Sequence, residues 1–142
     1  MSVESETITG TCLCGAVQLK AKTRSDEFGA CHCSMCRTWG GGPLLAVECE
    51  PDADVVGRED VTVFSSSDWA ERAFCRRCGT HLYYRLKLDG HYAVPLGLLG
   101  DHRDWKFSEQ IFVDEKPSCY AFANDTKHMT GAEVFAMFAP PE

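Results

Sequence analysis

Nine cysteines limit what this 142-residue chain can fold into more than any other feature of its sequence. Four of them stand in two close pairs, Cys12-x-Cys14-Gly15 and Cys75-x-x-Cys78-Gly79. Each pair can bring two sulfur ligands to one tetrahedral zinc ion, and the glycine that follows lets the chain turn tightly. The spacing therefore predicts a structural zinc held by Cys12, Cys14, Cys75 and Cys78. The alternative is four buried thiols or a disulfide.

A second constellation is the run Cys31-His32-Cys33-Ser34-Met35-Cys36. Residues two apart on an extended chain point to the same side, so Cys31 and Cys33 can face one metal ion. Cys36 can close onto that ion if the chain turns there. Three protein ligands leave a fourth position open, which distinguishes a catalytic zinc from a structural one. The alternatives are a redox thiol cluster and a site closed by a fourth protein ligand.

The chemistry of three thiolates narrows what such a zinc site would do. Three thiolates donate strongly and leave the centre with one formal negative charge, so the metal would polarise a carbonyl group only weakly. A thiol that binds at the open position would nevertheless lose its proton and become a nucleophile at neutral pH. The cluster of Cys31, Cys33 and Cys36 therefore favours catalysis on a thiol substrate.

Other polar and cysteine residues are weaker candidates. His32 is expected to point away from Cys31 and Cys33, as an outer group or a base. His81 fits a polar strand position better than a ligand position. Arg37 could offset the thiolate charge, hold a substrate carboxylate, or be an ordinary surface arginine. Cys49 and Cys119 are expected to pack as small apolar side chains.

Composition and charge exclude several classes of partner. The chain has 14 basic and 21 acidic residues and a formal charge of −7, which argues against binding nucleic acid or anionic lipid. Apolar stretches such as residues 43–47 and 93–99 are far shorter than the ~20 residues of a membrane helix. The start, MSVESETITG, has no signal-peptide pattern. We therefore expect a cytoplasmic protein with reduced thiols, in which clustered cysteines bind metal.

Alternating and turn patterns predict a mostly β protein with short helices, organised as one domain over residues 1–142. The expected strands are residues 17–22, 43–48, 61–65, 81–88, 111–113 and 120–123. Asp89-Gly90 predicts a two-residue hairpin turn after the fourth of these strands. Residues 35–39 and 130–138 are expected to be helical, the second with a capping box of Thr130 and Glu133. The acidic stretch 48–60 is expected to be a surface loop.

Three motifs together resemble the glutathione-dependent formaldehyde-activating enzymes, the Gfa family related to centromere protein V. They are G-x-C-x-C-G at residues 10–15, C-H-C-x-x-C-R at 31–37 and R-x-F-C-x-x-C-G-x-x-L at 72–82. The resemblance implies an Mss4-like β fold stapled by a structural zinc on Cys12, Cys14, Cys75 and Cys78. It also implies a catalytic zinc on Cys31, Cys33 and Cys36. The reaction it implies is that of a carbon–sulfur lyase, which joins glutathione and formaldehyde into S-hydroxymethylglutathione.

The chain departs from the family pattern at two places that bear on its substrate. Gln110 stands where members often carry histidine, and Pro117-Ser118-Cys119-Tyr120 lacks a tryptophan found in many of them. The expected partners are a small-molecule thiol such as glutathione and a small aldehyde. A non-catalytic binding module of the Mss4 type is the main alternative. A methionine sulfoxide reductase fits the cysteine spacing poorly.

Overall fold

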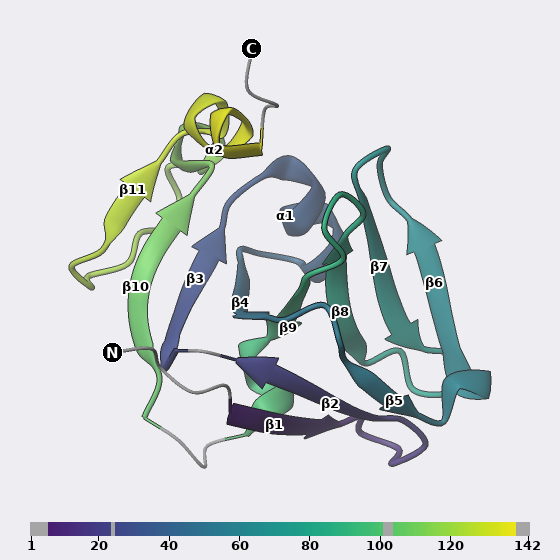
Figure 1. Ribbon diagram of the computed structural model, residues 1–142. Coiled ribbons are helices and arrows are strands. Elements are labelled where there is room, and N and C mark those ends of the chain that lie inside the picture. Colours follow the sequence, from purple (N-terminus) through teal and green to yellow (C-terminus); the bar gives the residue numbers. More distant parts are fainter. Residues whose placement is uncertain (1–5, 24, 101–103, 139–142) are drawn as a thin grey trace. The chain divides into compact units, whose positions relative to one another are not determined.

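The computed structural model describes residues 6–23, 25–100 and 104–138 (Figure 1). Among the described residues, strand residues far outnumber helical ones, which confirms the predicted β class with short helices. Contacts within the chain define two compact units, one from residues 1–26 and 46–104 and the other from residues 27–45 and 105–142. The single domain over residues 1–142 stays a prediction. Among the described residues, no helix has the length and apolar character needed to cross a membrane.

The first unit contains a small antiparallel sheet in the order β1-β2-β5. Its strands are β1 (Glu6–Thr11), β2 (Gln18–Thr23) and β5 (Asp54–Val56). Alternation explains β2, because Leu19 and Ala21 are buried while Lys20 and Lys22 are exposed. Cys12 and Cys14 follow β1 directly, in the turn that leads to β2.

The same unit contains four further antiparallel strands in the order β9-β8-β7-β6, and residues 46–49 of β4 pair with β9. These strands are β4 (Leu44–Cys49), β6 (Val61–Ser65), β7 (Ala70–Cys75), β8 (His81–Leu86) and β9 (Tyr92–Pro95). Val47, Leu82 and Val94 are at most 1% exposed and form part of the core. A 3-10 turn at Arg58–Asp60 precedes β6, and another at Leu96–Leu99 follows β9. The turn between β7 and β8 carries Cys78.

The second unit is built on a parallel sheet in the order β11-β10-β3 (Figure 1). Its strands are β3 (Glu27–Cys31), β10 (Lys106–Ile111) and β11 (Lys127–Met129). The chain leaves β3 into helix α1 (Ser34–Gly40), and a 3-10 turn (Val113–Glu115) follows β10. Cys31 pairs with Ile111, so the second cysteine group begins at the carboxyl end of a parallel strand.

The last helix, α2 (Gly131–Phe138), begins with the predicted capping box. The Glu133 N–H donates to Thr130 Oγ1 at 3.2 Å, and the Thr130 N–H donates to Glu133 Oε1 at 3.1 Å. Asp114 adds a third contact, because its Oδ1 accepts the Gly131 N–H at 2.8 Å. Side-chain oxygens therefore satisfy amides that the helix itself leaves unpaired.

Two of the predictions made for the first unit are wrong. Residues 48–60 are not only loop, because residues 54–56 form β5 against β2. The turn after β8 spans residues 87–90 and not two residues, since the Leu86 N–H donates to His91 O. Leu88 therefore lies in the turn, where it is 71% exposed. Gly90 does have the expected positive φ, 79°.

The structure also differs from the predicted strands 111–113 and 120–123. β10 ends at Ile111, because Phe112 adopts a left-handed conformation (φ 56°) that turns the chain out of the strand. Residues 120–123 are not a strand in the structure. The hydroxyl of Tyr120 instead bonds His32, which fixes this segment through a side chain.

His91, in the first unit, is expected to make stability fall at alkaline pH. Its Nε2 lies 2.9 Å from Glu48 Oε2 and its Nδ1 lies 2.7 Å from Asp89 Oδ1. The hydrogen bond to Glu48, supported by the Asp89 charge, raises the pKa of His91 to about 9. A raised pKa stabilises the fold fully below the unfolded value near 6.5, and this contribution is lost as the pH rises through 9. Because both carboxylates are largely exposed, we expect a loss of about 1 kcal/mol.

Urea unfolding at pH 6 and pH 9.5 would measure this loss in the wild type and in His91→Gln, which cannot titrate. The variant should show a flatter pH dependence over this range. Equal pH dependence in the two proteins would contradict the assignment to His91.

Two candidate metal centres

The first cysteine cluster joins two turns that are far apart in the sequence. The sulfur atoms of Cys12, Cys14, Cys75 and Cys78 all lie within 4.8 Å of one another. The Cys12 and Cys14 sulfurs are 3.6 Å apart, and those of Cys14 and Cys75 are 3.7 Å apart. A disulfide needs about 2.05 Å. The edge of a tetrahedron with bonds of 2.3 Å is about 3.8 Å, so the donor atoms fit a zinc ion with four thiolate ligands.

Backbone hydrogen bonds shape both turns of this cluster. The Gly15 N–H donates to Cys12 O at 3.0 Å, and the Gly79 N–H donates to Cys75 O at 2.8 Å. Both glycines have positive φ, 82° and 77°, as the sequence predicts for the residue after each pair. The Val17 N–H also donates to Cys12 Sγ at 3.3 Å. Such bonds hold the sulfur in place and favour its thiolate form.

Thr80 connects the two turns. Its Oγ1 accepts the Leu13 N–H at 3.2 Å and lies 3.1 Å from Cys78 Sγ. Since the oxygen accepts from Leu13, the hydroxyl proton is free to point at the sulfur. This hydrogen bond lowers the pKa of the Cys78 thiol to about 5. Cys78 is therefore prepared to act as a thiolate ligand.

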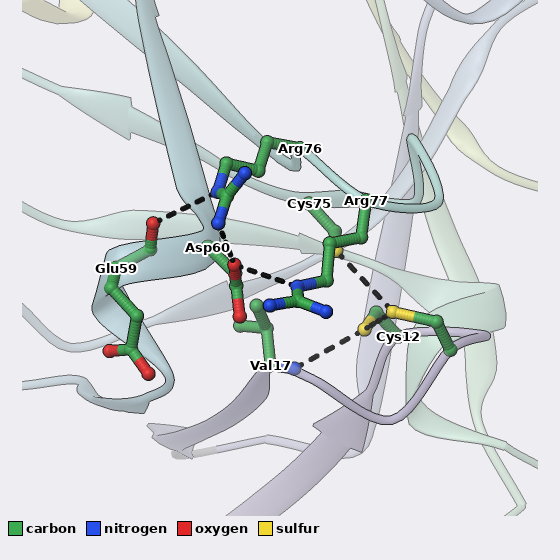
Figure 2. A network of polar contacts seen from close by, with 8 residues as sticks. Cys12, Val17, Glu59, Asp60, Cys75, Arg76 and Arg77 are labelled. Atoms are coloured by element: carbon green, nitrogen blue, oxygen red, sulfur yellow. Dashed lines mark hydrogen bonds and ion pairs between the residues drawn. The ribbon is translucent and has the colours of Figure 1, made fainter.

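Asp60 fixes the Cys75–Cys78 turn from outside, which the sequence analysis did not anticipate. Its side chain is 7% exposed, and Oδ1 accepts from Arg76 Nη2 at 2.8 Å and from Arg77 Nε at 2.9 Å (Figure 2). The hydrogen bond from Arg77 holds the pKa of Asp60 below its usual value. The two arginines are the variable residues of the C-x-x-C motif, so their charge is visible in the sequence, but their shared partner is not.

The second cluster lies at the corner between β3 and α1. The sulfurs of Cys31, Cys33 and Cys36 lie within 4.8 Å of one another. Cys31 ends β3, and Cys33 is the N-cap of α1, where its sulfur accepts the Cys36 N–H at 3.3 Å. The helix turn thus brings Cys36 back to Cys33, as its spacing predicts. Within the described residues, no fourth histidine, cysteine or carboxylate joins this group.

The chemistry of three adjacent thiols also suits a cation. Contacts with Cys33 and then with Cys36 raise the pKa of the Cys31 thiol well above its ordinary range. Three neighbouring sulfurs resist becoming three thiolates, because each negative charge disfavours the next. A divalent ion removes this obstacle, and metal binding at such a site releases protons. The donor set therefore fits zinc, with one coordination position left for a further ligand.

The remaining candidate residues lie outside both clusters. His32 is fully buried, with its ring nitrogens 2.8 Å from Tyr120 Oη and Gln110 Oε1, and burial lowers the pKa of its imidazole. His81 begins β8 as a half-buried strand residue. Cys49 is 5% exposed, as predicted, and burial raises the pKa of its thiol to about 12. Cys119 is exposed, so the expectation that it packs as an apolar residue is wrong.

Comparison with known proteins places the chain in a family. A family model described as glutathione-dependent formaldehyde-activating enzyme matches residues 7–115, more than half of the sequence and every clustered cysteine. The chain belongs to this family. The resemblance seen in the three motifs is therefore confirmed. The Mss4-like description of the fold stays a prediction.

Similar proteins agree with this family assignment. An uncharacterised lyase of Schizosaccharomyces pombe is 38% identical over 126 residues, which cover 88% of this chain and 92% of the relative. A Halomonas elongata protein, named provisionally as a glutathione-dependent formaldehyde-activating enzyme, is 32% identical over 85 residues, 54% of each chain. A crystal structure of a Rhodobacter sphaeroides protein matches with a TM-score of 0.58 and 26% identity, covering 71% of this chain and all of that one.

Proposed function

We propose that this protein is a zinc-dependent carbon–sulfur lyase that adds a small-molecule thiol such as glutathione to a small aldehyde such as formaldehyde. The observation that carries the proposal is the three-sulfur cluster of Cys31, Cys33 and Cys36, which leaves a metal ion one coordination position. The family match and the relative named as a lyase support the reaction class.

The two clusters would have different roles. Cys12, Cys14, Cys75 and Cys78 would hold a structural zinc, because four sulfurs complete its coordination and join segments about sixty residues apart. Cys31, Cys33 and Cys36 would hold the catalytic zinc. When bound there, the metal would lower the pKa of a thiol at its open position.

The reaction is an addition in which one bond forms and one proton moves. The thiol sulfur attacks the carbonyl carbon, the carbon–oxygen π electrons move to oxygen, and the thiol proton ends on that oxygen. For formaldehyde and glutathione the product is S-hydroxymethylglutathione, and the reverse reaction breaks the carbon–sulfur bond. The protein contributes a fixed site for the thiol, and proximity supplies much of the acceleration because the reactants combine unaided in water.

Exchange spectroscopy at equilibrium can test this function, because it measures the rate despite the spontaneous reaction. Carbon-13 formaldehyde and glutathione would be mixed with zinc-loaded protein, and magnetisation exchange between free aldehyde and adduct would be followed by NMR. Zinc-loaded wild-type protein should speed the exchange above the uncatalysed rate, and zinc-loaded Cys33→Ser protein, which keeps the first cluster, should not. S-methylglutathione, which has no thiol, is the matched substrate control. Exchange at the uncatalysed rate with zinc in both clusters would overturn the proposal and favour a non-catalytic binding module.

A further inference from the structure

His32, the residue between the first two cysteines of the second cluster, is held at every polar atom. It is 0% exposed. Its N–H donates to Ile111 O at 3.0 Å, and its carbonyl oxygen accepts from Arg37 Nε at 2.9 Å. Its ring nitrogens lie 2.8 Å from Tyr120 Oη and 2.8 Å from Gln110 Oε1. Four hydrogen bonds therefore fix the one residue that links Cys31 to Cys33.

Gln110 determines where the hydrogens of this network lie. It is 4% exposed, and its amide nitrogen donates to Thr126 Oγ1 at 2.8 Å and faces His128 Nε2 at 3.5 Å. In this orientation of the amide, the oxygen faces His32 and can only accept. His32 Nε2 must then carry the hydrogen, and in the neutral ring Nδ1 accepts from the Tyr120 hydroxyl. One amide thus fixes both the tautomer and the orientation of the ring.

We propose that Gln110 is a positioning residue for the cluster of Cys31, Cys33 and Cys36. Acting through the His32 ring, it fixes the corner between β3 and α1 and hence the spacing of the three sulfurs. This inference rests on the proposed function, because it assumes that the cluster holds a metal ion.

The position of the His32 hydrogen-bond network explains how Gln110 would control the spacing of the three sulfurs. Cys31 is the last residue of β3 and Cys33 is the N-cap of α1, so a change in the backbone torsions of His32 changes the direction in which one sulfur points relative to the other. A buried polar network costs desolvation energy that an apolar set of the same volume would avoid. When every polar group in such a network is hydrogen-bonded, the network favours a single geometry. Groups that orient metal ligands from outside commonly change metal affinity by about 10–100-fold when they are removed.

A cobalt(II) titration tests the proposal without measuring catalysis. Cobalt bound by thiolates absorbs light through charge transfer, and a Cys33→Ser variant gives the signal of the first cluster alone. Gln110→Met keeps the volume but removes the acceptor, and it should weaken cobalt binding at the second cluster by about 10–100-fold. Gln110→Glu keeps an acceptor for His32 while Thr126 can turn to donate, so its affinity should stay within about threefold of wild type.

Two further variants separate positioning from general stability. Met129→Ala removes a side chain on β11 that is 6% exposed, and it should lower the melting temperature without changing cobalt affinity. Tyr120→Phe removes only the hydroxyl on His32 Nδ1 and should weaken cobalt binding about tenfold. Because Tyr120 is half-buried, this variant also decides the question if Gln110→Met does not fold.

The outcomes are distinct. Wild-type cobalt affinity in Gln110→Met or in Tyr120→Phe would overturn the proposal. The proposal would also be overturned if Gln110→Glu or Met129→Ala lost as much cobalt affinity as Gln110→Met. Cobalt affinity would then follow the stability of the fold and not the hydrogen bond to His32. If the second cluster of the wild type bound neither cobalt nor zinc, the proposed function itself would fail, and this inference with it.

Discussion

Replacing Cys75 with alanine is expected to cost the protein one zinc ion and at least about 5 kcal/mol of unfolding free energy, enough to unfold a domain of ordinary stability. Cys75 is 0% exposed at the end of β7, and its sulfur lies 3.7 Å from that of Cys14. Binding of a structural metal is coupled to folding, since an unfolded chain does not preform the site. Elemental analysis and urea unfolding of wild type and variant measure both quantities.

Cys49→Ala is the matched control for this experiment. Cys49 is also buried, at 5% exposed, and it undergoes the same chemical change, but it lies outside both clusters. We expect it to cost about 1 kcal/mol and to leave the zinc content unchanged. If the two variants lost equal stability and retained equal zinc, the first cluster would be an ordinary group of buried thiols.

Local patterns were sufficient to predict only some of the strands. β2 alternates clearly, because one face of the strand packs inward and the other faces solvent. The alternation expected for β8 is not observed, because the neighbouring residues Leu82 and Tyr83 are both buried. β7 was missed because it is buried or half-buried along its whole length, which removes the alternation. β3 and β11 were missed because their pairing depends on β10, which lies far from β3 in the sequence. Tertiary pairing, not local preference, creates these two strands.

The cysteine clusters could be predicted because ligand spacing is a local property of the sequence. The turns that bring Cys12 near Cys14 and Cys33 near Cys36 involve only the residues between them and the next few. The groups that support the clusters from outside could not be predicted in this way, because they come from distant parts of the sequence. Gln110 meets His32 across 78 positions, and no spacing rule connects them. Gln110 stands out in the sequence only through the resemblance to the family pattern, in which histidine often occupies this position.

Replacing Cys33 with serine is expected to abolish catalysis while preserving the fold. Cys33 is the N-cap of α1, where its sulfur accepts the Cys36 N–H. Serine is a preferred N-cap residue, so its hydroxyl can take over this hydrogen bond and the helix should remain. A neutral hydroxyl is a poor zinc ligand compared with a thiolate, so the second cluster should lose its metal. We expect one zinc per chain instead of two, and a catalysed thiol–aldehyde exchange reduced at least about 100-fold.

The same exchange measurement on Cys119→Ser provides the control. Cys119 is exposed, lies outside the three-sulfur cluster and undergoes the same chemical change, so zinc content and rate should match the wild type. A Cys33→Ser protein with one zinc and full activity would show that the thiol reacts elsewhere. Loss of activity in Cys119→Ser as well would mean that a fourth sulfur takes part, and the site would then be closed rather than open to substrate. If Cys33→Ser loses the catalysed exchange and Cys119→Ser keeps it, the result supports a substrate thiol that binds at the coordination position left free by the protein.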